Sequence, residues 1–246
     1  MTWIYFSPHF DDVALSCGGL VWEQAHADEK VAIWTICGGE PPPGDLSPFA
    51  EMLHTRWEAG RNAPANRKAE DIYSCQRLGA RYYHFSVLDC IYRRHPQTGE
   101  FMYASEQSLN GPLHPGDVQV ITDLANEFRR TLPSDVTLVC PLSLGNHVDH
   151  QLTRLAMEQL GHTILYYADF PYVLRDSSWI NKLQNDGWKS QIYPISEEGL
   201  LAWQDSICAH GSQISTFWPD QAKMRRVVSH YMLENRGIRL WNRPTS

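Results

Sequence analysis

The chain has 246 residues, of which 43% are hydrophobic and 20% charged, and these ordinary globular values exclude disordered, collagen-like and membrane-spanning classes. Its 21 Lys and Arg residues and 28 Asp and Glu residues give a formal net charge of −7, so no overall positive field favours nucleic acid or anionic lipid as a partner. The length predicts a single α/β domain over residues 1–246.

The hydrophobic pattern alternates between strands and helices along most of the chain. The repeated strand–helix order predicts a mostly parallel sheet with helices on both faces. A Pro-rich stretch at 41–48 is expected to be a surface loop, and a polar segment at 87–115 is expected to form a small β-hairpin excursion that walls a substrate pocket. The expected elements, in chain order, are a strand at 2–7, a helix at 11–27, a strand at 31–37, a helix at 67–79, strand 81–86, helix 117–131, strand 136–140, helix 147–160, strands 164–173 and 188–195, and helices 197–209 and 219–234.

Two clusters of histidine and aspartate lie where a predicted strand passes into a helix. PHFDD at 8–12 follows the first strand, and HVDH at 147–150 begins the helix after the strand at 136–140. In a parallel sheet such junctions meet at one edge, so two imidazoles and a carboxylate can converge from distant parts of the chain. This combination predicts a metal site with open positions for water and substrate.

The spacing within each cluster suits metal-assisted hydrolysis. His147 and His150 are three residues apart, which places both on one face of the first helical turn. Adjacent Asp11 and Asp12 point in different directions, so one can bind the metal while the other lies beside a coordinated water. A divalent cation lowers the pKa of that water from about 15.7 toward ~7, and a nearby carboxylate can take its proton as the water attacks a carbonyl carbon.

Each cluster also has a structural interpretation. His9 can be a hydrogen-bonded loop histidine, and Asp11 with Asp12 can cap a helix and favour its dipole. Two such clusters at equivalent junctions make coincidence much harder to accept. The remaining histidines are isolated and are mostly expected on the surface or in packing.

The residues at the amino terminus carry neither the basic segment nor the apolar stretch of a secretory signal. No apolar run approaches the roughly 20 residues of a membrane span. These features predict a cytoplasmic protein. The six cysteines are scattered without a C-x-x-C pair, which favours free buried thiols over disulfides or a cysteine metal site.

P-H-F-D-D followed by H-V-D-H closely resembles the PIG-L or LmbE-like deacetylases, whose signature pairs PH-x-DD near the amino terminus with a later H-x-DH. R-x-x-E at Arg67 and Glu70, DCIYR at 89–93, and Ser212 with Gln213 also resemble members of this family. The resemblance spans most of the chain. It implies a Rossmann-like fold, zinc or else Fe²⁺ or another divalent cation, and N-deacetylation of a GlcNAc-containing small molecule or glycoconjugate. Self-association into a homo-oligomer stays open.

By position, the resemblance implies that His9, Asp12 and His150 bind the metal. Asp11 would then be the general base that takes a proton from the attacking water. The first motif departs from the family pattern, because it has Phe10 where Pro is usual and lacks the acidic residue that commonly follows the double Asp. The paired metal clusters are nevertheless much more specific than the secondary motifs.

The other roles that the resemblance implies fall on the second cluster and the substrate face. His147 would stabilise the oxyanion or protonate the leaving amine, and Asp149 would orient the His147 imidazole and hold it charged. Arg67 and Asp89 match positions that hold sugar hydroxyls. Some relatives have a tyrosine where this chain has Gly145. Three tyrosines are candidates to replace it, although core packing is the more common role for such residues: Tyr166, Tyr167 and Tyr172.

Two other functions use similar residues. A metal-dependent glycosyltransferase would hold a sugar diphosphate through oxygen-rich ligands, whereas two imidazoles suit zinc or iron better. A non-catalytic, metal-stabilised sugar-binding protein would not need the second carboxylate at Asp11. Some tryptophans can stack on sugar rings, although more are expected in the core: Trp57, Trp179, Trp203 and Trp218.

Overall fold

The centre of the protein is a seven-stranded sheet of order β3-β2-β1-β4-β5-β7-β6. The computed structural model describes residues 1–57, 60–176 and 178–244. The first five strands of that order pair in parallel, whereas β7 is antiparallel to both β5 and β6. The strands are β1 (Thr2–Ser7), β2 (Lys30–Thr35), β3 (Arg81–His84), β4 (Thr137–Pro141), β5 (Ile164–Tyr167), β6 (Lys189–Tyr193) and β7 (Ile238–Asn242).

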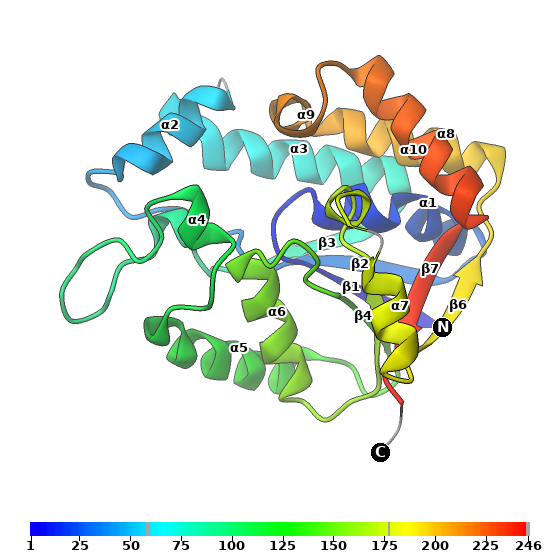
Figure 1. Ribbon diagram of the computed structural model, residues 1–246, viewed down its shortest axis with the longest axis horizontal. Coiled ribbons are helices and arrows are strands. Elements are labelled where there is room, and N and C mark those ends of the chain that lie inside the picture. The colour runs from blue at the N-terminus through cyan, green and yellow to red at the C-terminus, as the bar shows by residue number, and fades with distance from the viewer. Residues whose placement is uncertain (58–59, 177, 245–246) are drawn as a thin grey trace.

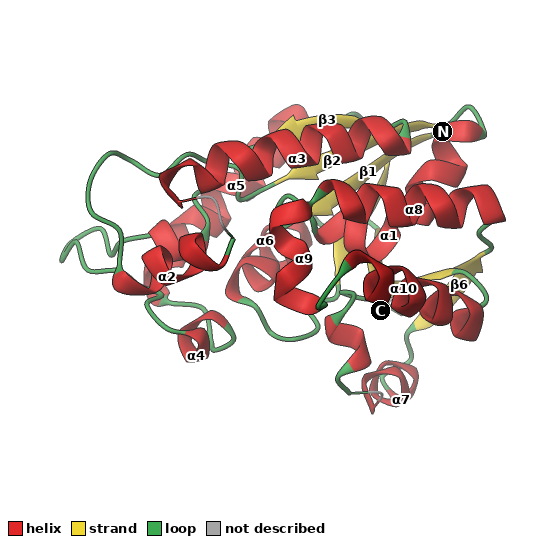
Figure 2. Cartoon of the chain, turned by 90° about the horizontal axis from the view of Figure 1, so that it is seen from above, coloured by secondary structure: helices red, strands yellow, loops and turns green. Residues whose placement is uncertain are grey.

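Helices cover both faces of the sheet (Figure 1). One face carries α1, α3 and α8, with α9 and α10 beyond them, and the other carries α5 and α6. Figure 2 shows the first group from above. The helices are α1 (Asp12–His26), α2 (Pro48–Arg56), α3 (Ala63–Leu78), α4 (Glu106–Leu109), α5 (Val118–Thr131), α6 (Val148–Glu158), α7 (Ser178–Asn185), α8 (Glu197–Ala209), α9 (Gly211–Phe217) and α10 (Gln221–Asn235).

The apolar pattern explains why these elements form. The central strand β1 is buried on both faces, as the unbroken run TWIYFS requires. On α5 the buried residues recur at helical spacing, from Ile121 to Phe128, and the Phe128 ring packs 5.0 Å from that of Phe6, centroid to centroid. Helix α3 ends at Gly79, whose φ of +70° lies in the left-handed region. The predicted Rossmann-like α/β fold, with its mostly parallel sheet, is confirmed.

Several elements differ from the sequence prediction. Helix α2 begins within the Pro-rich stretch, because Pro48 suits the first turn and the Ser47 side chain accepts a hydrogen bond from the Ala50 amide. Strand β5 is shorter than predicted, since the chain turns away after Tyr167. In the excursion the expected hairpin is reduced to one antiparallel bridge between Arg94 and Phe101, beside a 3₁₀ turn and α4. The segments α7, α9 and β7 were not predicted.

Two of the bulk predictions can be compared with the structure. All six cysteines are free, and five of them are buried, as their scattered positions predicted. Within residues 1–57, 60–176 and 178–244, no helix has the length and apolar content needed to cross a membrane.

Candidate metal and active site

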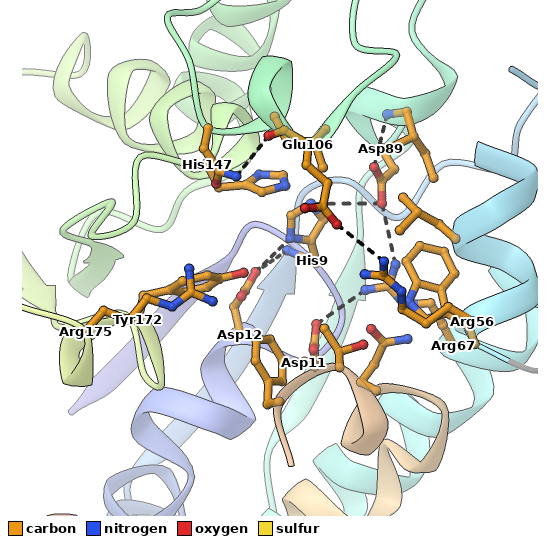
Figure 3. Close-up of a pocket in the computed structure, with 18 residues that line it drawn as sticks. His9, Asp11, Asp12, Arg56, Arg67, Asp89, Glu106, His147, Tyr172 and Arg175 are labelled. Carbon is orange, nitrogen blue, oxygen red and sulfur yellow. Dashed lines mark hydrogen bonds and ion pairs between the residues drawn. The ribbon is translucent and has the colours of Figure 1, made fainter. Parts of the chain in front are cut away.

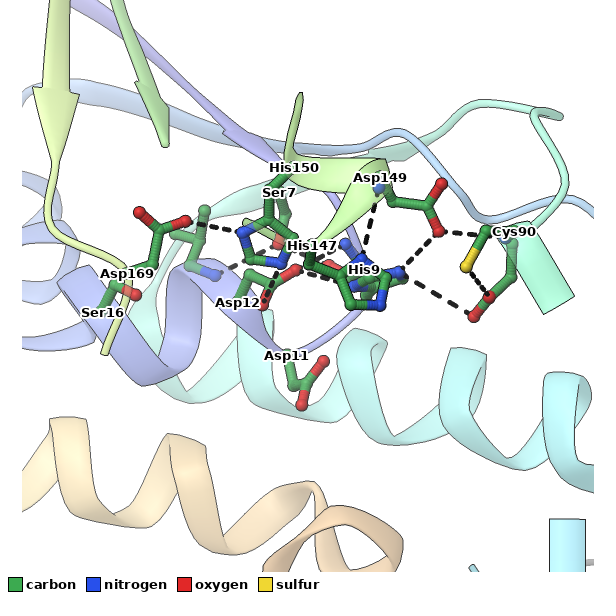
Figure 4. Close-up of polar contacts among 12 residues, drawn as sticks. Ser7, His9, Asp11, Asp12, Ser16, Cys90, His147, Asp149, His150 and Asp169 are labelled. Carbon is green, nitrogen blue, oxygen red and sulfur yellow. Dashed lines mark hydrogen bonds and ion pairs between the residues drawn. The ribbon is translucent and has the colours of Figure 1, made fainter. Parts of the chain in front are cut away.

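Both histidine motifs lie at the same edge of the sheet, beyond the ends of β1 and β4 (Figure 4). His9 follows β1, and Asp12 is the first residue of α1. Asp11 occupies the position before that helix, yet its side chain makes no capping hydrogen bond. The structural interpretation of Asp11 as a helix cap is therefore not realised, and its carboxylate faces the cavity (Figure 3).

Asp12 lies between two imidazoles. Its Oδ2 is 3.1 Å from Nδ1 of His9 and its Oδ1 is 3.3 Å from Nε2 of His150. Zinc bonds of 2.0 to 2.1 Å in tetrahedral geometry separate neighbouring ligand atoms by about 3.4 Å. Each of the two distances, measured from a different oxygen of Asp12, is close to that separation, and imidazole nitrogens and carboxylate oxygens are donors that zinc uses.

The outer nitrogens of the same two imidazoles each meet a buried carboxylate (Figure 4). Nε2 of His9 lies 2.9 Å from Asp149, and Nδ1 of His150 lies 2.6 Å from Asp169. Histidines that bind metals commonly donate their second N–H to a carboxylate, which fixes the ring and the tautomer. Asp169 was missed in the sequence, although a carboxylate just beyond a parallel strand is a usable signal.

A second ligand set is also present among the described residues. One ring nitrogen from each of His9, His147 and His150 lies within 4.8 Å of the others. We favour Asp12 over His147 as the third ligand, because no carboxylate within residues 1–57, 60–176 and 178–244 hydrogen-bonds to the His147 ring. Instead Nδ1 of His147 accepts a hydrogen bond from the backbone amide of Asp149 at 3.3 Å.

Burial and charge divide the histidines into two kinds. Burial, and then the neighbouring His9, lower the pKa of His147 to about 3, so this imidazole is neutral. Burial acts on His150 in the same direction, but the carboxylates of Asp12 and Asp169 outweigh it and raise its pKa to about 10. The carboxylates that raise the pKa of His150 also attract a metal cation. A cation bound to the imidazole nitrogen would replace the proton there.

Asp149 does not take the place expected for it. Its carboxylate hydrogen-bonds to His9, to the Cys90 amide and to Arg93, while its hydrogen bond with His147 is made by its backbone amide. Together with the neutral state of His147, these contacts differ from the expected role of holding that imidazole charged. The buried guanidinium of Arg93 pairs with this carboxylate and holds it in those contacts.

The two residues expected to hold substrate lie together at the cavity wall (Figure 3). Nη2 of Arg67 is 3.4 Å from Asp11 and Nη1 is 3.5 Å from Asp89. The guanidinium also lies 4.7 Å from the ring centroid of Trp57, and Arg67 is only 7% exposed. Arg67 is thus ion-paired and buried, and its nearest charged partner is the predicted general base.

A cavity of about 330 Å³ lies over these residues. Its floor carries His9, Asp11, Asp12 and His147, and its walls come from α2, α4, α9 and the segment after β5. The wall has an apolar part and a charged rim in which Arg56 pairs with Glu106 at 3.3 Å. The main apolar lining residues are Leu53, Trp57, Ile91, Leu109 and Phe217.

Of the three candidate tyrosines, Tyr172 is the one that lines this cavity in the described part of the chain. Tyr167 is fully buried and donates a hydrogen bond to the Phe6 carbonyl. A Cβ placed on Gly145 would lie 2.8 Å from the Tyr172 ring. Tyr172 therefore fills the space beside Gly145 that a side chain at that position would need. Of the four tryptophans considered, Trp57 lines the cavity, whereas Trp203 and Trp218 are buried in the core.

Curated relatives share most of this chain. A 2'-N-acetylparomamine deacetylase from Niallia circulans is 28% identical over 227 residues, covering 83% of this chain and 80% of the relative. A protein of the same name from Streptomyces fradiae is 30% identical over 175 residues, covering 68% of this chain and 56% of the relative.

Solved structures share the fold. The zinc-inhibited form of teicoplanin deacetylase Orf2 superposes with a TM-score of 0.81 at 22% identity, covering 98% of this chain and 97% of that one. N,N'-diacetylchitobiose deacetylase from Pyrococcus horikoshii gives a TM-score of 0.57 at 18% identity, covering 98% and 81%. The family model described as PIG-L, GlcNAc-PI de-N-acetylase, matches residues 4–160. This match includes both histidine motifs and more than half of the chain, and the chain therefore belongs to the PIG-L family.

Proposed function

We propose that this protein is a metal-dependent amidohydrolase that removes the N-acetyl group from a GlcNAc-containing small molecule or glycoconjugate. The observation that carries the proposal is the position of Asp12 between two imidazoles whose outer nitrogens each meet a carboxylate. Membership of the PIG-L family and the names of the curated relatives support the same chemistry.

The proposed metal ligands are His9, Asp12 and His150. A cation held there would polarise the amide carbonyl and make a water more acidic. Zinc is the proposed metal, because two imidazoles and one carboxylate suit it, and Fe²⁺ is the alternative for the same ligands. The zinc in the Orf2 structure belongs to that protein and supports the choice only by analogy.

Asp11 is the proposed general base. It takes one proton from the water whose oxygen adds to the carbonyl carbon, and it returns that proton to the nitrogen as the C–N bond breaks, giving a free amine and acetic acid, which keeps the second proton until it ionises to acetate. Arg67 holds the Asp11 carboxylate at the cavity wall. Both side chains are largely buried, and the charge pair orients the base.

His147 is the proposed oxyanion donor. Its ring is neutral and its Nδ1 already accepts a hydrogen bond, so the ring proton is carried by Nε2. That N–H can donate to the oxygen as negative charge develops on it. A neutral donor serves this role without adding a positive charge that would compete with the cation.

Substrate recognition is proposed for Arg67 and Asp89, which line the cavity as a charged pair. Asp89 has the stronger claim to a sugar hydroxyl, because the charge of Arg67 is shared between two carboxylates. The sugar-binding alternative does not explain why Asp11 and Arg67 form a buried ion pair at the cavity wall. The glycosyltransferase alternative does not account for two imidazoles around Asp12. A single domain, a cytoplasmic location and self-association stay predictions.

The test measures metal content and acetate release together. Purified protein is analysed for its metal and assayed on N-acetylglucosaminyl compounds with and without a chelator. The variant Asp11→Asn is compared with Asp123→Asn, an exposed position on α5 whose side chain accepts a hydrogen bond from Gln119. We expect Asp11→Asn to lower acetate release about 10²- to 10⁴-fold with unchanged metal content, and the control to match the wild type.

Two results would contradict the proposal. Full activity in Asp11→Asn would show that Asp11 is not the general base. A protein that holds its metal and binds N-acetylated sugars, yet releases acetate from none of them, would favour the sugar-binding alternative.

A further inference from the structure

A buried chain of ionic and hydrogen bonds leads from His9 into the excursion that walls the cavity. Asp149 contacts His9 through Oδ2, at 2.9 Å, and Arg93 through Oδ1. The second arm of the Arg93 guanidinium donates to Asp117 at 2.9 Å, and Asp117 also accepts the Tyr103 hydroxyl at 2.6 Å. These contacts join residues that are far apart in the sequence.

Arg93 lies at the centre of this chain and is only 5% exposed, while both of its carboxylate partners are fully buried. A buried guanidinium is tolerated when planar, two-pronged contacts satisfy it. The two terminal nitrogens of Arg93 are paired: Nη1 donates to Asp149 and, at 3.0 Å, to the Leu88 carbonyl, and Nη2 donates to Asp117, whereas the buried Nε has no hydrogen-bond partner among the described residues. Removing the guanidinium would leave two buried carboxylates without their cation.

The same contacts fix the cavity wall. The Cys90 amide donates to Asp149 at 3.0 Å, on the oxygen that also faces His9 (Figure 4). Asp89 and Ile91, on either side of Cys90, both line the cavity. One carboxylate therefore positions a proposed metal ligand and the backbone of the proposed substrate wall at once.

We propose that Arg93 is a positioning residue that couples metal binding to the ordering of the substrate wall at residues 88–93. It fixes Asp149, which in turn orients His9 and holds the Cys90 amide. Binding free energies at coupled sites are reciprocal, so a cation at His9 orders the wall, and an ordered wall strengthens cation binding. The inference rests on the proposed metal site, but it does not require that the protein hydrolyses amides.

The experiment measures zinc affinity and backbone hydrogen exchange in the full chain. Zinc affinity is obtained by competition with a chelator, and exchange is followed with and without zinc at residues 8–16 and 88–93. The variant is Arg93→Lys, which keeps the charge but loses the two-pronged contact. Its matched control is Arg94→Lys, the next residue, which is exposed and bonds to backbone carbonyls of Asp45 and Gly99.

In the wild type we expect zinc to slow exchange in both segments. In Arg93→Lys we expect a zinc Kd about 10- to 100-fold weaker, the range for the outer partners of metal ligands, and slowing by zinc at 8–16 only. Arg94→Lys should behave as the wild type. A residue that served only general stability would lower the melting temperature without separating the two segments in this way.

Tyr103→Phe decides the matter if Arg93→Lys does not fold. It removes one hydroxyl from the far end of the chain, and we expect a smaller loss of zinc affinity in the same direction. The proposal is overturned if a folded Arg93→Lys or, failing that, Tyr103→Phe binds zinc within twofold of the wild-type affinity. It is also overturned if zinc does not change hydrogen exchange at residues 88–93 in the wild type. Inactivity on N-acetylated sugars, with these binding results intact, would count against the proposed function alone.

Discussion

Asp169 stands directly behind His150, with its Oδ1 2.6 Å from Nδ1 of the imidazole, so that Nε2 is turned toward Asp12. The second oxygen of Asp169 accepts the Leu144 amide at 2.9 Å. One carboxylate thus fixes both the ring of a proposed metal ligand and the loop that leads to the second histidine motif.

We therefore expect Asp169→Asn to weaken zinc binding about 10- to 100-fold, because an amide orients the imidazole less strongly than a carboxylate. The measurement is chelator competition on the purified variant. Asp186→Asn, an exposed position after α7, serves as the control. Unchanged affinity in Asp169→Asn would mean that the carboxylate is not needed to position His150.

The two ligand sets around His9 and His150 make different predictions for His147→Ala. If Asp12 is the third ligand, this variant keeps its metal and loses about 10²- to 10³-fold in kcat, the effect of removing one oxyanion donor. If His147 is the third ligand, the metal is lost. Elemental analysis of His147→Ala beside Asp12→Ala separates the two, and we expect metal loss only in Asp12→Ala.

Much of the site could be predicted because its central residues are local in sequence. PHFDD and HVDH each place metal-binding residue types within five positions of the sequence. Because parallel strands end at one edge of a sheet, the two motifs are expected to lie close together. Asp169 was not predicted as a site residue, because the predicted strand continued to residue 173 and therefore included it. The chain in fact leaves β5 after Tyr167, so Asp169 lies at the same edge as the two motifs.

Arg93 could not be predicted for a different reason. Arg93 ends the DCIYR segment that resembles the family, but its residue type and neighbours do not show that it is buried between two carboxylates while Arg94 is exposed. What separates them is the long-range packing of the excursion against α6 and the turn before α5. The same dependence on distant partners explains why β7 was missed: its five residues gain their hydrogen bonds from β5 and β6.

Gly145 gives a prediction about stability. Its φ of +86° is in the left-handed region, and an added Cβ would lie 2.8 Å from the Tyr172 ring. We expect Gly145→Ala to lower the free energy of unfolding by about 1 to 3 kcal/mol, from backbone strain plus the clash. Denaturant unfolding measures the change.

The matched control is Gly161→Ala. Gly161 has a φ of +69° and no atom within 4 Å of an added Cβ, so this variant reports the cost of the backbone conformation alone. We expect a smaller loss there, of about 1 kcal/mol. Equal losses of unfolding free energy at both positions would show that the Tyr172 ring can move away from the added methyl group without lowering stability. Removing the ring in a Gly145→Ala, Tyr172→Ala double variant should reduce the difference between the two positions.

The pairing of Arg67 with Asp11 and Asp89 leads to the last prediction. Arg67→Met removes the cation but keeps much of the packing against Trp57. If the main task of Arg67 is to hold the general base, kcat falls while KM changes little, because the lost contact acts in the transition state. If its main task is to hold a sugar hydroxyl in the bound substrate, KM rises with kcat nearly unchanged.

We expect the first pattern, because Arg67 is buried and the carboxylate nearest to its guanidinium is that of the proposed general base, Asp11, at 3.4 Å. Arg77→Met, on the same helix but packed over Tyr73 at the surface, controls for the loss of a guanidinium from α3. Asp89→Asn completes the set: the loss of a sugar contact there should raise KM. A rise in KM alone in Arg67→Met would transfer the substrate role to Arg67 and leave Asp11 to be held by other groups.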